Sequence, residues 1–351
     1  MRVLSIGTDR KLFEDGSIVR DRQMAYAQKL GALDIIVFTK RGYHEVRLGT
    51  LSITPTNSSS RLMYGFDAWR AAKRLPKPDV ITAQDPFETG LIALFIARRL
   101  KAPLHIQVHT DFTSKAFARH SFLNWLRQRI AWYVLKRASR IRVILGRTAG
   151  DIQSRGINSP VTVLPIFVDS ARFAKIPRAK HRRWKIALLC IGRFEKEKRF
   201  ELAIQALSLV RQKGHDAGLT IVGGGSERQK YYRFAQRLRV ADRVDIVGWH
   251  NNLEKFYSEA DALLVPSRYE GYGLVIVEAL SAGIPVIATD VGVAREAGAI
   301  VVSPKEFPQA VVRWIENGPR SASLAQVPYI DIDDYVSRYC ADIAATVATV
   351  V

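Results

Sequence analysis

The chain has 351 residues, of which 48% are hydrophobic and 25% are charged. This composition is typical of globular proteins and excludes an intrinsically disordered chain, while the length predicts two domains of roughly 150 to 200 residues. The longest apolar run, residues 89–100, ends in two arginines and is shorter than the ~20 residues of a membrane-spanning helix. We therefore expect a soluble or peripheral protein.

The two cysteines, Cys190 and Cys340, stand alone in apolar contexts and form no disulfide or metal-binding pattern. We expect both to be buried thiols in a reducing compartment. Residues 2–7 predict a first β-strand rather than the apolar core of a secretory signal. These features predict a cytoplasmic protein.

The formal net charge of +20 is distributed unevenly along the chain. Residues 1–170 contain 27 Lys and Arg against 13 Asp and Glu, whereas residues 171–351 contain 26 against 20. An excess of this size favours an anionic partner. Phospholipid, nucleic acid and an acidic substrate are the open alternatives.

Apolar, β-rich segments alternate with helical ones along both halves of the chain. In the first half we expect strands at 2–7, 33–39, 79–82, 104–108, 140–145 and 161–164, and helices at about 20–31, 64–74, 88–100 and 119–138. In the second half we expect strands at 184–191, 218–222, 243–247, 261–265, 285–288 and 299–303, and helices at about 199–213, 226–239, 253–258, 273–282 and 306–316. Such alternation predicts two doubly wound, parallel α/β sheets.

The predicted domains follow from this alternation. We expect an N-terminal Rossmann-like domain over residues 1–170, a polar linker over 171–183 and a C-terminal Rossmann-like domain over 184–332, with a further helix over 333–351. Ligands of such sheets bind outside the carboxyl ends of the strands. Two sheets that face each other would place the main site in a central cleft.

Residues 190–207 leave a predicted strand and enter a helix. Arg193 and Lys198 flank the helix N-terminus, where free N–H groups and the helix dipole attract anions. The segment is therefore a candidate diphosphate clamp. Alternatively, Glu195 and Glu197 pair with these bases in a solvated loop.

A second strand, glycine loop and helix occupy residues 219–238. The glycine triplet that begins at Gly223 lacks the spacing of dinucleotide-binding loops. It either lets a ligand approach the backbone or forms a plain turn, with Ser226 and Glu227 capping the next helix.

The segment 267–290 carries two carboxylates in an otherwise apolar context. Glu270 falls in the loop after a strand, and Glu278 falls on an apolar helix, where burying an unpaired carboxylate is costly. Gly271 and Gly273 leave the backbone N–H groups of the intervening turn accessible. Together these groups would hold an extended ligand at two points with a phosphate between them, unless Glu278 is simply a partly exposed helix residue.

Polar residues also follow two predicted strands of the first half. His109 and Asp111 come after the strand 104–108, and Asp85 comes after the strand 79–82. A Rossmann-type sheet presents ligand groups at this edge. A histidine there can contact a sugar hydroxyl or a phosphate, although a single histidine at a strand end is also a common structural residue.

The loop 192–198, the segment 222–227, His109 and above all "SRYEGYGLVIVEALSAGIPVIAT" (267–289) resemble the retaining nucleotide-sugar glycosyltransferases of the GT-B fold. The resemblance covers nearly the whole chain. It implies two Rossmann-like domains that face a central cleft, with the donor mainly on the second domain. It also implies that the terminal helix crosses back onto the first domain.

The resemblance implies a retaining hexosyltransferase that moves a sugar from a UDP-, GDP- or related nucleotide sugar to an acceptor by a same-face mechanism. His109 and Glu270 would be the catalytic residues. No metal or cofactor is implied, because two cationic side chains would neutralise the diphosphate. The donor-binding residues would be Arg193, Lys198, Gly223, Gly248, Trp249, Gly271, Tyr272, Gly273, Leu274 and Glu278.

Residues 115–147 contain nine Lys and Arg and no Asp or Glu, interleaved with Trp125, Trp132 and Tyr133. This pattern predicts an interfacial helix on an anionic membrane, here the inner face of the membrane. Similar transferases that glycosylate lipid or lipid-linked acceptors often dock in this way, so such an acceptor is expected. The alternative is a helix pair with a solvated basic face.

Two other functions are open from the sequence. A non-catalytic binder of nucleic acid or of an anionic surface would explain the charge but not Glu270 and Glu278, and no nucleic-acid recognition motif is present. A GT-B-fold epimerase would release altered sugar without an acceptor. A phosphorylase would need a lysine for a pyridoxal cofactor, which the sequence does not identify.

Overall fold

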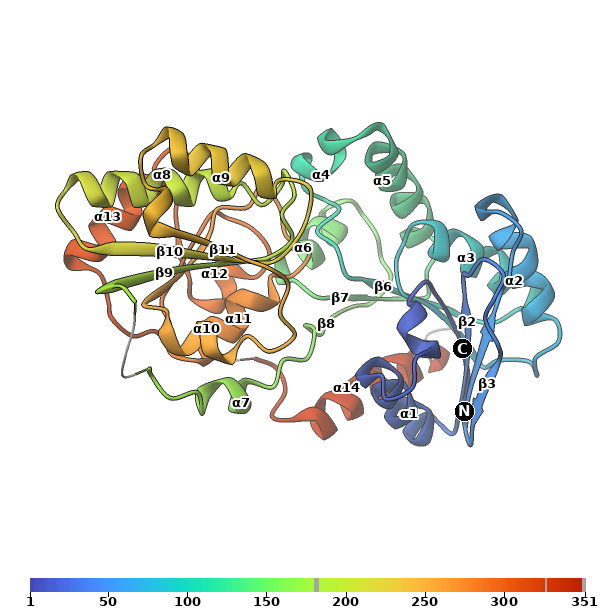
Figure 1. Cartoon of the computed structure of the whole chain (residues 1–351). Coiled ribbons are helices and arrows are strands. Elements are labelled where there is room, and N and C mark those ends of the chain that lie inside the picture. Colours follow the sequence, from blue (N-terminus) through green and yellow to red (C-terminus); the bar gives the residue numbers. More distant parts are fainter. Residues whose placement is uncertain (180–182, 326, 349–351) are drawn as a thin grey trace. The chain divides into compact units, whose positions relative to one another are not determined.

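The computed structural model of the chain describes residues 1–179, 183–325 and 327–348, and describes residues 115 and 116 by their backbone only (Figure 1). The chain divides into two compact units, one formed by Met1–Pro165 together with the segment that begins at Pro328, the other by Ile166–Val327. Each unit is built on a sheet of its own. No helix within the described ranges combines the length and the apolar character needed to cross a bilayer.

The first unit contains an eight-stranded sheet with the order β3-β4-β2-β1-β5-β6-β7-β8, in which only β3 runs antiparallel to its neighbour. The strands are β1 (Arg2–Gly7), β2 (Ala32–Val37), β3 (Val46–Leu48), β4 (Leu51–Pro55), β5 (Val80–Ala83), β6 (Leu104–Val108), β7 (Arg140–Val143) and β8 (Val161–Val163). The helices are η1 (Arg10–Phe13), α1 (Ile18–Leu30), η2 (Arg61–Met63), α2 (Tyr64–Ala72), α3 (Glu88–Leu100), α4 (Lys115–His120), α5 (Phe122–Leu135), α6 (Gly146–Ser154) and α14 (Ile332–Ala348).

Several elements of the first unit, among them α6, differ from the sequence-based expectations. The hairpin of β3 and β4 was not predicted, because it is short and its β3 strand lies at the partly exposed edge of the sheet. The helix expected over 119–138 is divided at Ser121, whose extended backbone ends α4 and whose side chain accepts a hydrogen bond from Asn124 N, 3.1 Å away, at the start of α5.

The second unit contains a six-stranded, wholly parallel sheet with the order β11-β10-β9-β12-β13-β14. Its strands are β9 (Ile186–Ile191), β10 (Ala217–Val222), β11 (Val244–Val247), β12 (Ala262–Val265), β13 (Val286–Ala288) and β14 (Ile300–Val301). Its helices are α7 (Ser170–Ala174), α8 (Phe200–Gln212), α9 (Arg228–Arg237), η3 (Ala241–Arg243), α10 (Glu254–Glu259), α11 (Leu274–Ser281), α12 (Ala294–Ala297) and α13 (Phe307–Asn317). Figure 1 shows α8, α9 and α13 over one face of this sheet and α10 and α11 over the other.

The start of the predicted linker 171–183 is part of the second unit. Asp169 caps helix α7, and Phe173 packs edge-on against Tyr257, with ring centroids 5.7 Å apart. The unit boundary at 165 therefore precedes the expected boundary at 170. Residues 180–182 of the predicted linker lie outside the described residues.

The terminal helix α14 packs in the first unit against α1, β5 and β6. Its inner face meets polar side chains that are almost wholly buried, which is unusual for a sheet surface. Arg142 on β7 is 2% exposed and donates to Tyr335 Oη at 2.8 Å, while Asp342 accepts from Arg140 Nε at 2.6 Å. Residues 349–351 of the predicted helix lie outside the described part of the chain.

The proton positions in this buried network follow from its acceptors. Gln107 Oε1 can only accept, so Arg142 Nη1 donates to it at 3.0 Å and His109 Nε2 donates to it at 3.2 Å. His105 Nε2 lies 3.1 Å from Asp342 Oδ2 and its Nδ1 lies 2.8 Å from Thr82 Oγ1. A neutral His105 that donates to Asp342 and accepts from Thr82 satisfies both contacts.

Acid should destabilise the first unit through His109. Burial, assisted by the charge of Arg142, lowers the pKa of His109 to about 3 from the usual 6.5. Its contribution to the free energy of unfolding is therefore complete above pH 6.5 and is lost as the pH falls toward 3. We expect the melting temperature to fall steadily between pH 6.5 and 4. His109→Asn should flatten that decline; an unchanged slope would contradict the assignment.

Candidate functional site

The second sheet has a topological switch point between β9 and β12. The chain begins at β9, adds β10 and β11 on one side, and returns to add β12, β13 and β14 on the other. Loops that diverge at such a point leave a crevice at the carboxyl ends of the strands, where ligands of α/β sheets bind. The loops after β9, β10, β11 and β12, together with α11, carry every donor-side residue predicted from the sequence.

An ion pair bridges this switch point. Lys198, after β9, directs its Nζ to both carboxylate oxygens of Glu270, after β12, at 2.7 and 2.8 Å. Both side chains are largely buried, with 13% and 11% exposure. Ser267 Oγ donates a further hydrogen bond to Glu270 Oε1 at 2.7 Å. The structure thus brings together two residues that the sequence placed 72 positions apart, and it pairs them with each other.

The loop that carries Glu270 is held by groups that the sequence did not identify. Arg199, at the start of α8, donates from Nε to Pro266 O at 2.8 Å and from Nη2 to Ser267 O at 2.9 Å. Thr289 Oγ1 donates to Ser267 O at 2.6 Å. The loop is therefore fixed from both neighbouring strands. No local pattern predicts these contacts, because each partner is more than 20 residues away.

The glycine loop after β10 requires glycine at its first position. Gly223 has φ +150°, and a Cβ there would lie 1.9 Å from Gly192 O. The backbones after β9 and β10 therefore approach more closely than any side chain allows. The loop is thus a place where two backbone segments of the chain pass close to each other, rather than a plain turn. Glu227 follows at the N-terminus of α9, but its side chain makes no capping hydrogen bond to that helix.

Helix α11 begins beside Glu270. Its N-cap residue Gly273 has φ +92°, and the carbonyl of the preceding Tyr272 accepts from Val293 N at 2.8 Å. No acidic residue lies in the first turn of α11, where the exposed Leu274 begins the helix. Helix N-termini carry backbone N–H groups that lack intrahelical partners, and these groups together with the helix dipole favour an anion.

Glu278 lies in the second turn of α11 and is hydrogen-bonded within the unit. Tyr257 Oη, on α10, donates to Glu278 Oε2 at 2.6 Å. Burial raises the pKa of Glu278, and the hydrogen bond from Tyr257 opposes that rise. Glu278 is thus a partly buried carboxylate with one oxygen held by a phenol that the sequence did not single out.

The remaining predicted donor residues lie at more open positions. The Arg193 side chain is 70% exposed and lies 3.5 Å from Glu197, one of the two pairings left open by the sequence. Trp249 is 69% exposed, and its Nε1 donates to Asn251 Oδ1 at 3.2 Å. Nothing lies within 4 Å of a Cβ placed on Gly248, so the loop after β11 is open on that side.

The candidate residues of the first unit end the neighbouring strands β5 and β6. His109 follows β6 and is neutral, with Nε2 bound to Gln107. Burial raises the pKa of Asp111, which pairs with Arg147 at 2.9 Å, and burial also raises the pKa of Asp85. These residues lie at the carboxyl edge of the first sheet, and the hydrogen bond between Gln107 and His109 was not predicted.

The sequence pattern predicted that the basic segment 115–147 forms one interfacial surface. In the structure its cations are divided between the surface and the interior. Arg142 is buried against α14, Arg140 pairs with Asp342, and Arg147 pairs with Asp111. These three cations belong to β7 and α6, and their side chains make contacts within the first unit. The surface that the segment does form lies on α4 and α5.

Comparisons with known proteins identify the family of the chain. A model of the Glycosyltransferase Family 4 matches residues 25–172, and a model of the Glycosyl transferases group 1 matches residues 173–325. The lipopolysaccharide core biosynthesis mannosyltransferase LpsB of Rhizobium meliloti is 27% identical over 64% of this chain and 67% of that protein. A GDP-mannose-dependent phosphatidylinositol monomannoside mannosyltransferase of Mycobacterium tuberculosis is 32% identical over 38% of this chain and 39% of that protein.

Two solved structures illustrate the shared fold. The lipopolysaccharide outer core galactosyltransferase WaaB, in its apo form, aligns over 100% of both chains with a TM-score of 0.70 and 17% identity. Anabaena HepE in complex with UDP covers 99% of this chain and 97% of that chain, with a TM-score of 0.67 and 15% identity. The two family matches and the shared fold together identify the chain as a glycosyltransferase. The chain belongs to the glycosyltransferases of the GT-B type, as the sequence predicted.

Proposed function

We propose that the protein is a retaining hexosyltransferase that uses a nucleotide-sugar donor and needs no metal ion. The observation that carries the proposal is the Lys198–Glu270 pair at the switch point of the second sheet, directly before the N-terminus of α11. A cation, a carboxylate and the N-terminus of a helix suit the diphosphate and the sugar of one ligand.

Each residue of this site has a distinct role in the proposal. Lys198 has three N–H donors, of which two point to Glu270, so the third is available to the diphosphate. The exposed Arg193 neutralises further phosphate charge. Glu270 and the N–H groups from Tyr272 to Leu274 hold the sugar and the phosphate. Glu278 accepts from the ribose hydroxyls, and the loop of Gly248 and Trp249 lies along the base.

The reaction would proceed on one face of the sugar. The bond from the anomeric carbon to the diphosphate oxygen breaks, the acceptor oxygen bonds to the same face of that carbon, and the acceptor proton passes to the leaving phosphate. Oriented cations and N–H groups stabilise the charge that grows on the diphosphate. His109, held neutral, would hydrogen-bond the donor sugar through its Nδ1.

The relatives suggest the class of substrates. Two of them are named as mannosyltransferases of lipopolysaccharide core and of phosphatidylinositol mannoside, and solved neighbours are described with UDP and with UDP-glucose. We infer a hexose donor carried on UDP or GDP, and a lipid or lipid-linked glycan as acceptor. The enzyme would work at the cytoplasmic face of a membrane.

A donor panel tests the proposal. Purified protein is screened by thermal shift against UDP-, GDP-, ADP- and TDP-hexoses, and the anomeric configuration of the product is read by NMR. Stabilisation by one nucleotide class and a product with the donor's configuration support the proposal. Free altered sugar in the absence of acceptor would indicate an epimerase, and no stabilisation by any donor would refute a transferase.

Tyr257→Phe should weaken donor binding selectively. The change removes the phenol that holds Glu278 and allows the pKa of that carboxyl to rise further. A lost hydrogen bond to a carboxylate costs about 1.5 kcal/mol or more, so we expect the KM for the donor to rise about 10-fold, with kcat within about 2-fold. The defect should be larger at pH 6 than at pH 8.

The matched control is Tyr232→Phe, because Tyr232 is a half-exposed tyrosine of the same unit. It should leave the KM unchanged. A Tyr257→Phe enzyme with normal KM at both pH values would remove Glu278 from the donor site.

We further propose that the first unit docks on an anionic membrane through an apolar–basic face, formed by exposed residues of α3 and α5. Helix α5 exposes Phe122, Leu123, Trp125 and Leu126, by 78%, 50%, 43% and 40%. Two arginines lie over its aromatic rings, Arg129 at 5.2 Å from Trp125 and Arg137 at 3.8 Å from Tyr133. Helix α3, which packs against α5, adds Leu91 and Phe95. Exposed aromatics bordered by arginines suit the headgroup region of a bilayer.

Removing the apolar part of this face should reduce membrane binding. We expect the triple variant Phe122→Gln, Trp125→Gln and Leu126→Gln to lower co-sedimentation with phosphatidylglycerol-containing vesicles at least about 10-fold, since each buried apolar side chain contributes about 1.5 kcal/mol or more. The control variant Ile18→Gln, Tyr232→Gln and Ile330→Gln changes exposed apolar residues elsewhere. Equal losses in both variants, or no binding of the wild type at low salt, would refute the proposal.

A further inference from the structure

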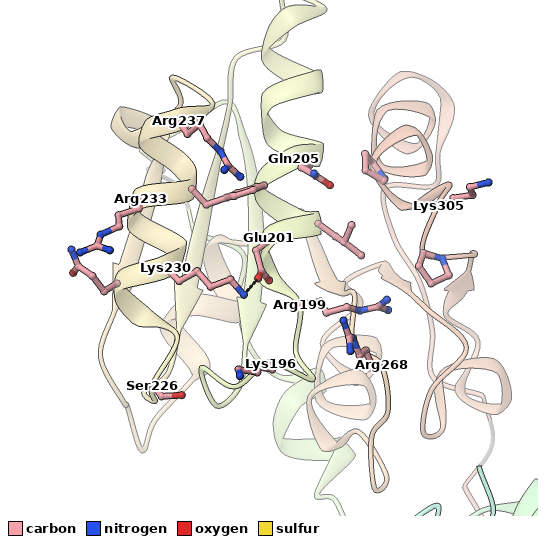
Figure 2. A pocket seen from close by; sticks show the side chains of 15 residues that line it. Lys196, Arg199, Glu201, Gln205, Ser226, Lys230, Arg233, Arg237, Arg268 and Lys305 are labelled. Atoms are coloured by element: carbon pink, nitrogen blue, oxygen red, sulfur yellow. Dashed lines mark ion pairs between the residues drawn. The ribbon is translucent and has the colours of Figure 1, made fainter. Parts of the chain in front are cut away.

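A basic groove of about 1150 Å³ lies on the second unit between α8, α9 and the segments that precede α11 and α13 (Figure 2). Helix α9 contributes Lys230, Arg233 and Arg237. The other cations are Lys196, Arg199, Arg268 and Lys305. Arg193, Lys198, Glu270 and Glu278 do not line it. The groove is therefore distinct from the proposed donor site.

The charge of this groove is not explained by the general basicity of the chain. Residues 166–327 contain 25 Lys and Arg and 17 Asp and Glu. Seven of these cations but only one of these carboxylates, Glu201, line the groove. The rest of the unit is almost balanced in charge, so the excess is concentrated here. A concave surface of one sign focuses the electrostatic field on a ligand.

Most of these cations have no carboxylate partner in the described part of the chain. Lys230 pairs with Glu201 and with Glu227, as Figure 2 shows for the first of them. Among the described residues, Arg233, Arg268 and Lys305 form no ion pair. Arg199 and Arg268 both line the groove, where Figure 2 shows their side chains near each other. Burial and the neighbouring charge of Arg268 lower the pKa of Arg199. Like charges that lie close together oppose folding, so a purely structural role does not explain why they are gathered here.

The uncharged lining narrows the class of ligand. Gln205, Ser226 and Gln229 add hydrogen-bonding amide and hydroxyl groups, and Phe234 and Leu202 add a partly buried apolar strip. This mixture suits the hydroxyls and ring faces of a sugar. A bilayer surface would instead require protruding apolar side chains. A nucleic acid would require several stacking aromatics, whereas the one aromatic ring in the lining, Phe234, is covered by Arg237 at 4.7 Å.

We propose that the basic groove binds a polyanionic oligosaccharide, a glycan that carries several phosphate, sulfate or carboxylate groups. Its volume exceeds that of a single anion, and its separate cations offer several charge-assisted hydrogen bonds along one chain. Binding does not depend on the donor site, because none of the residues assigned to the donor lines the groove.

The test uses the full chain without donor. A fluorescent heparin hexasaccharide is the anionic glycan, maltohexaose is the neutral glycan, tripolyphosphate is the anion without sugar, and phosphatidylglycerol vesicles supply the lipid surface. The groove variant is Arg233→Gln, Arg237→Gln and Lys305→Gln. The control is Lys185→Gln, Lys255→Gln and Arg313→Gln, which removes the same charge from the same unit outside the groove. Thermal unfolding checks that both variants fold.

We expect the heparin hexasaccharide to bind the wild type and to be released by about 0.5 M salt, because salt screens the attraction between exposed charges. It should bind the groove variant at least 10-fold more weakly. The control should change affinity less than 2-fold, and the groove variant should be at least as stable as the wild type. An equal loss of heparin affinity in both variants would mean that binding depends on net charge alone, and it would overturn the proposal. Competition by tripolyphosphate or vesicles at equal charge concentration would overturn the glycan assignment, as would the absence of heparin binding.

Discussion

Glu270→Gln should reduce kcat/KM by about 100- to 1000-fold, the range observed when one group that stabilises transition-state charge is removed. Glutamine keeps the size of the side chain and one oxygen that can accept from Lys198 or Ser267. It loses the negative charge that orients Lys198 across the switch point. The loss should therefore affect kcat rather than folding, and steady-state kinetics with the donor found in the panel measures it.

A double-mutant cycle with Lys198→Met separates two roles of Glu270. If Glu270 acts mainly by orienting Lys198, the double variant should be little worse than either single variant. The control Glu316→Gln removes an exposed carboxylate on α13 that lies 3.7 Å from Lys213, and it should keep activity within about 2-fold. Wild-type kcat/KM in a folded Glu270→Gln protein would remove the pair from the reaction.

The sequence predicted the sheets well because their signals are local. Buried strands such as β9 and β12 are continuous apolar runs, and glycine-containing loops mark their carboxyl ends. The resemblance of the segment 267–289 to a known family then predicted which loops bind the donor. Both signals are contained within short stretches of chain, so no knowledge of distant contacts was needed.

The contacts between these loops were not predictable in the same way. Arg199 carries no distinguishing signal in the sequence, yet its side chain donates to the carbonyls of Pro266 and Ser267. Tyr257 lies on a short helix with no motif, yet it holds Glu278. Long side chains bind partners set by the fold, and spacing along one chain does not reveal those partners.

Arg142 is the clearest case, because a charged residue in a basic stretch predicts a surface position. The structure instead buries its guanidinium among oxygen acceptors, Gln107 Oε1, Leu164 O and Tyr335 Oη, at 3.0, 2.9 and 2.8 Å. The same group lies 5.1 Å from the ring centroid of Tyr339. Arg142 therefore ties β7, the end of β8 and α14 to one another.

Arg142→Leu should destabilise the protein by about 3–5 kcal/mol, because it leaves buried acceptors without donors. In a unit of this size that loss lowers the melting temperature by roughly 6–20 °C. The loss should be concentrated at α14, whose contacts to β7 depend on this side chain. Differential scanning calorimetry measures the first effect, and amide hydrogen exchange of residues 332–348 measures the second.

The control Arg137→Leu makes the same substitution on an exposed arginine just after α5, whose side chain, among the described residues, donates to Tyr133 O at 2.9 Å. It should change the free energy of unfolding by no more than about 0.5 kcal/mol. Arg142→Lys should fall between the two, because an ammonium keeps the charge but cannot span acceptors on three segments. If Arg142→Leu instead left both the melting temperature and the protection of α14 unchanged, the buried guanidinium would not be what holds the terminal helix to the first sheet.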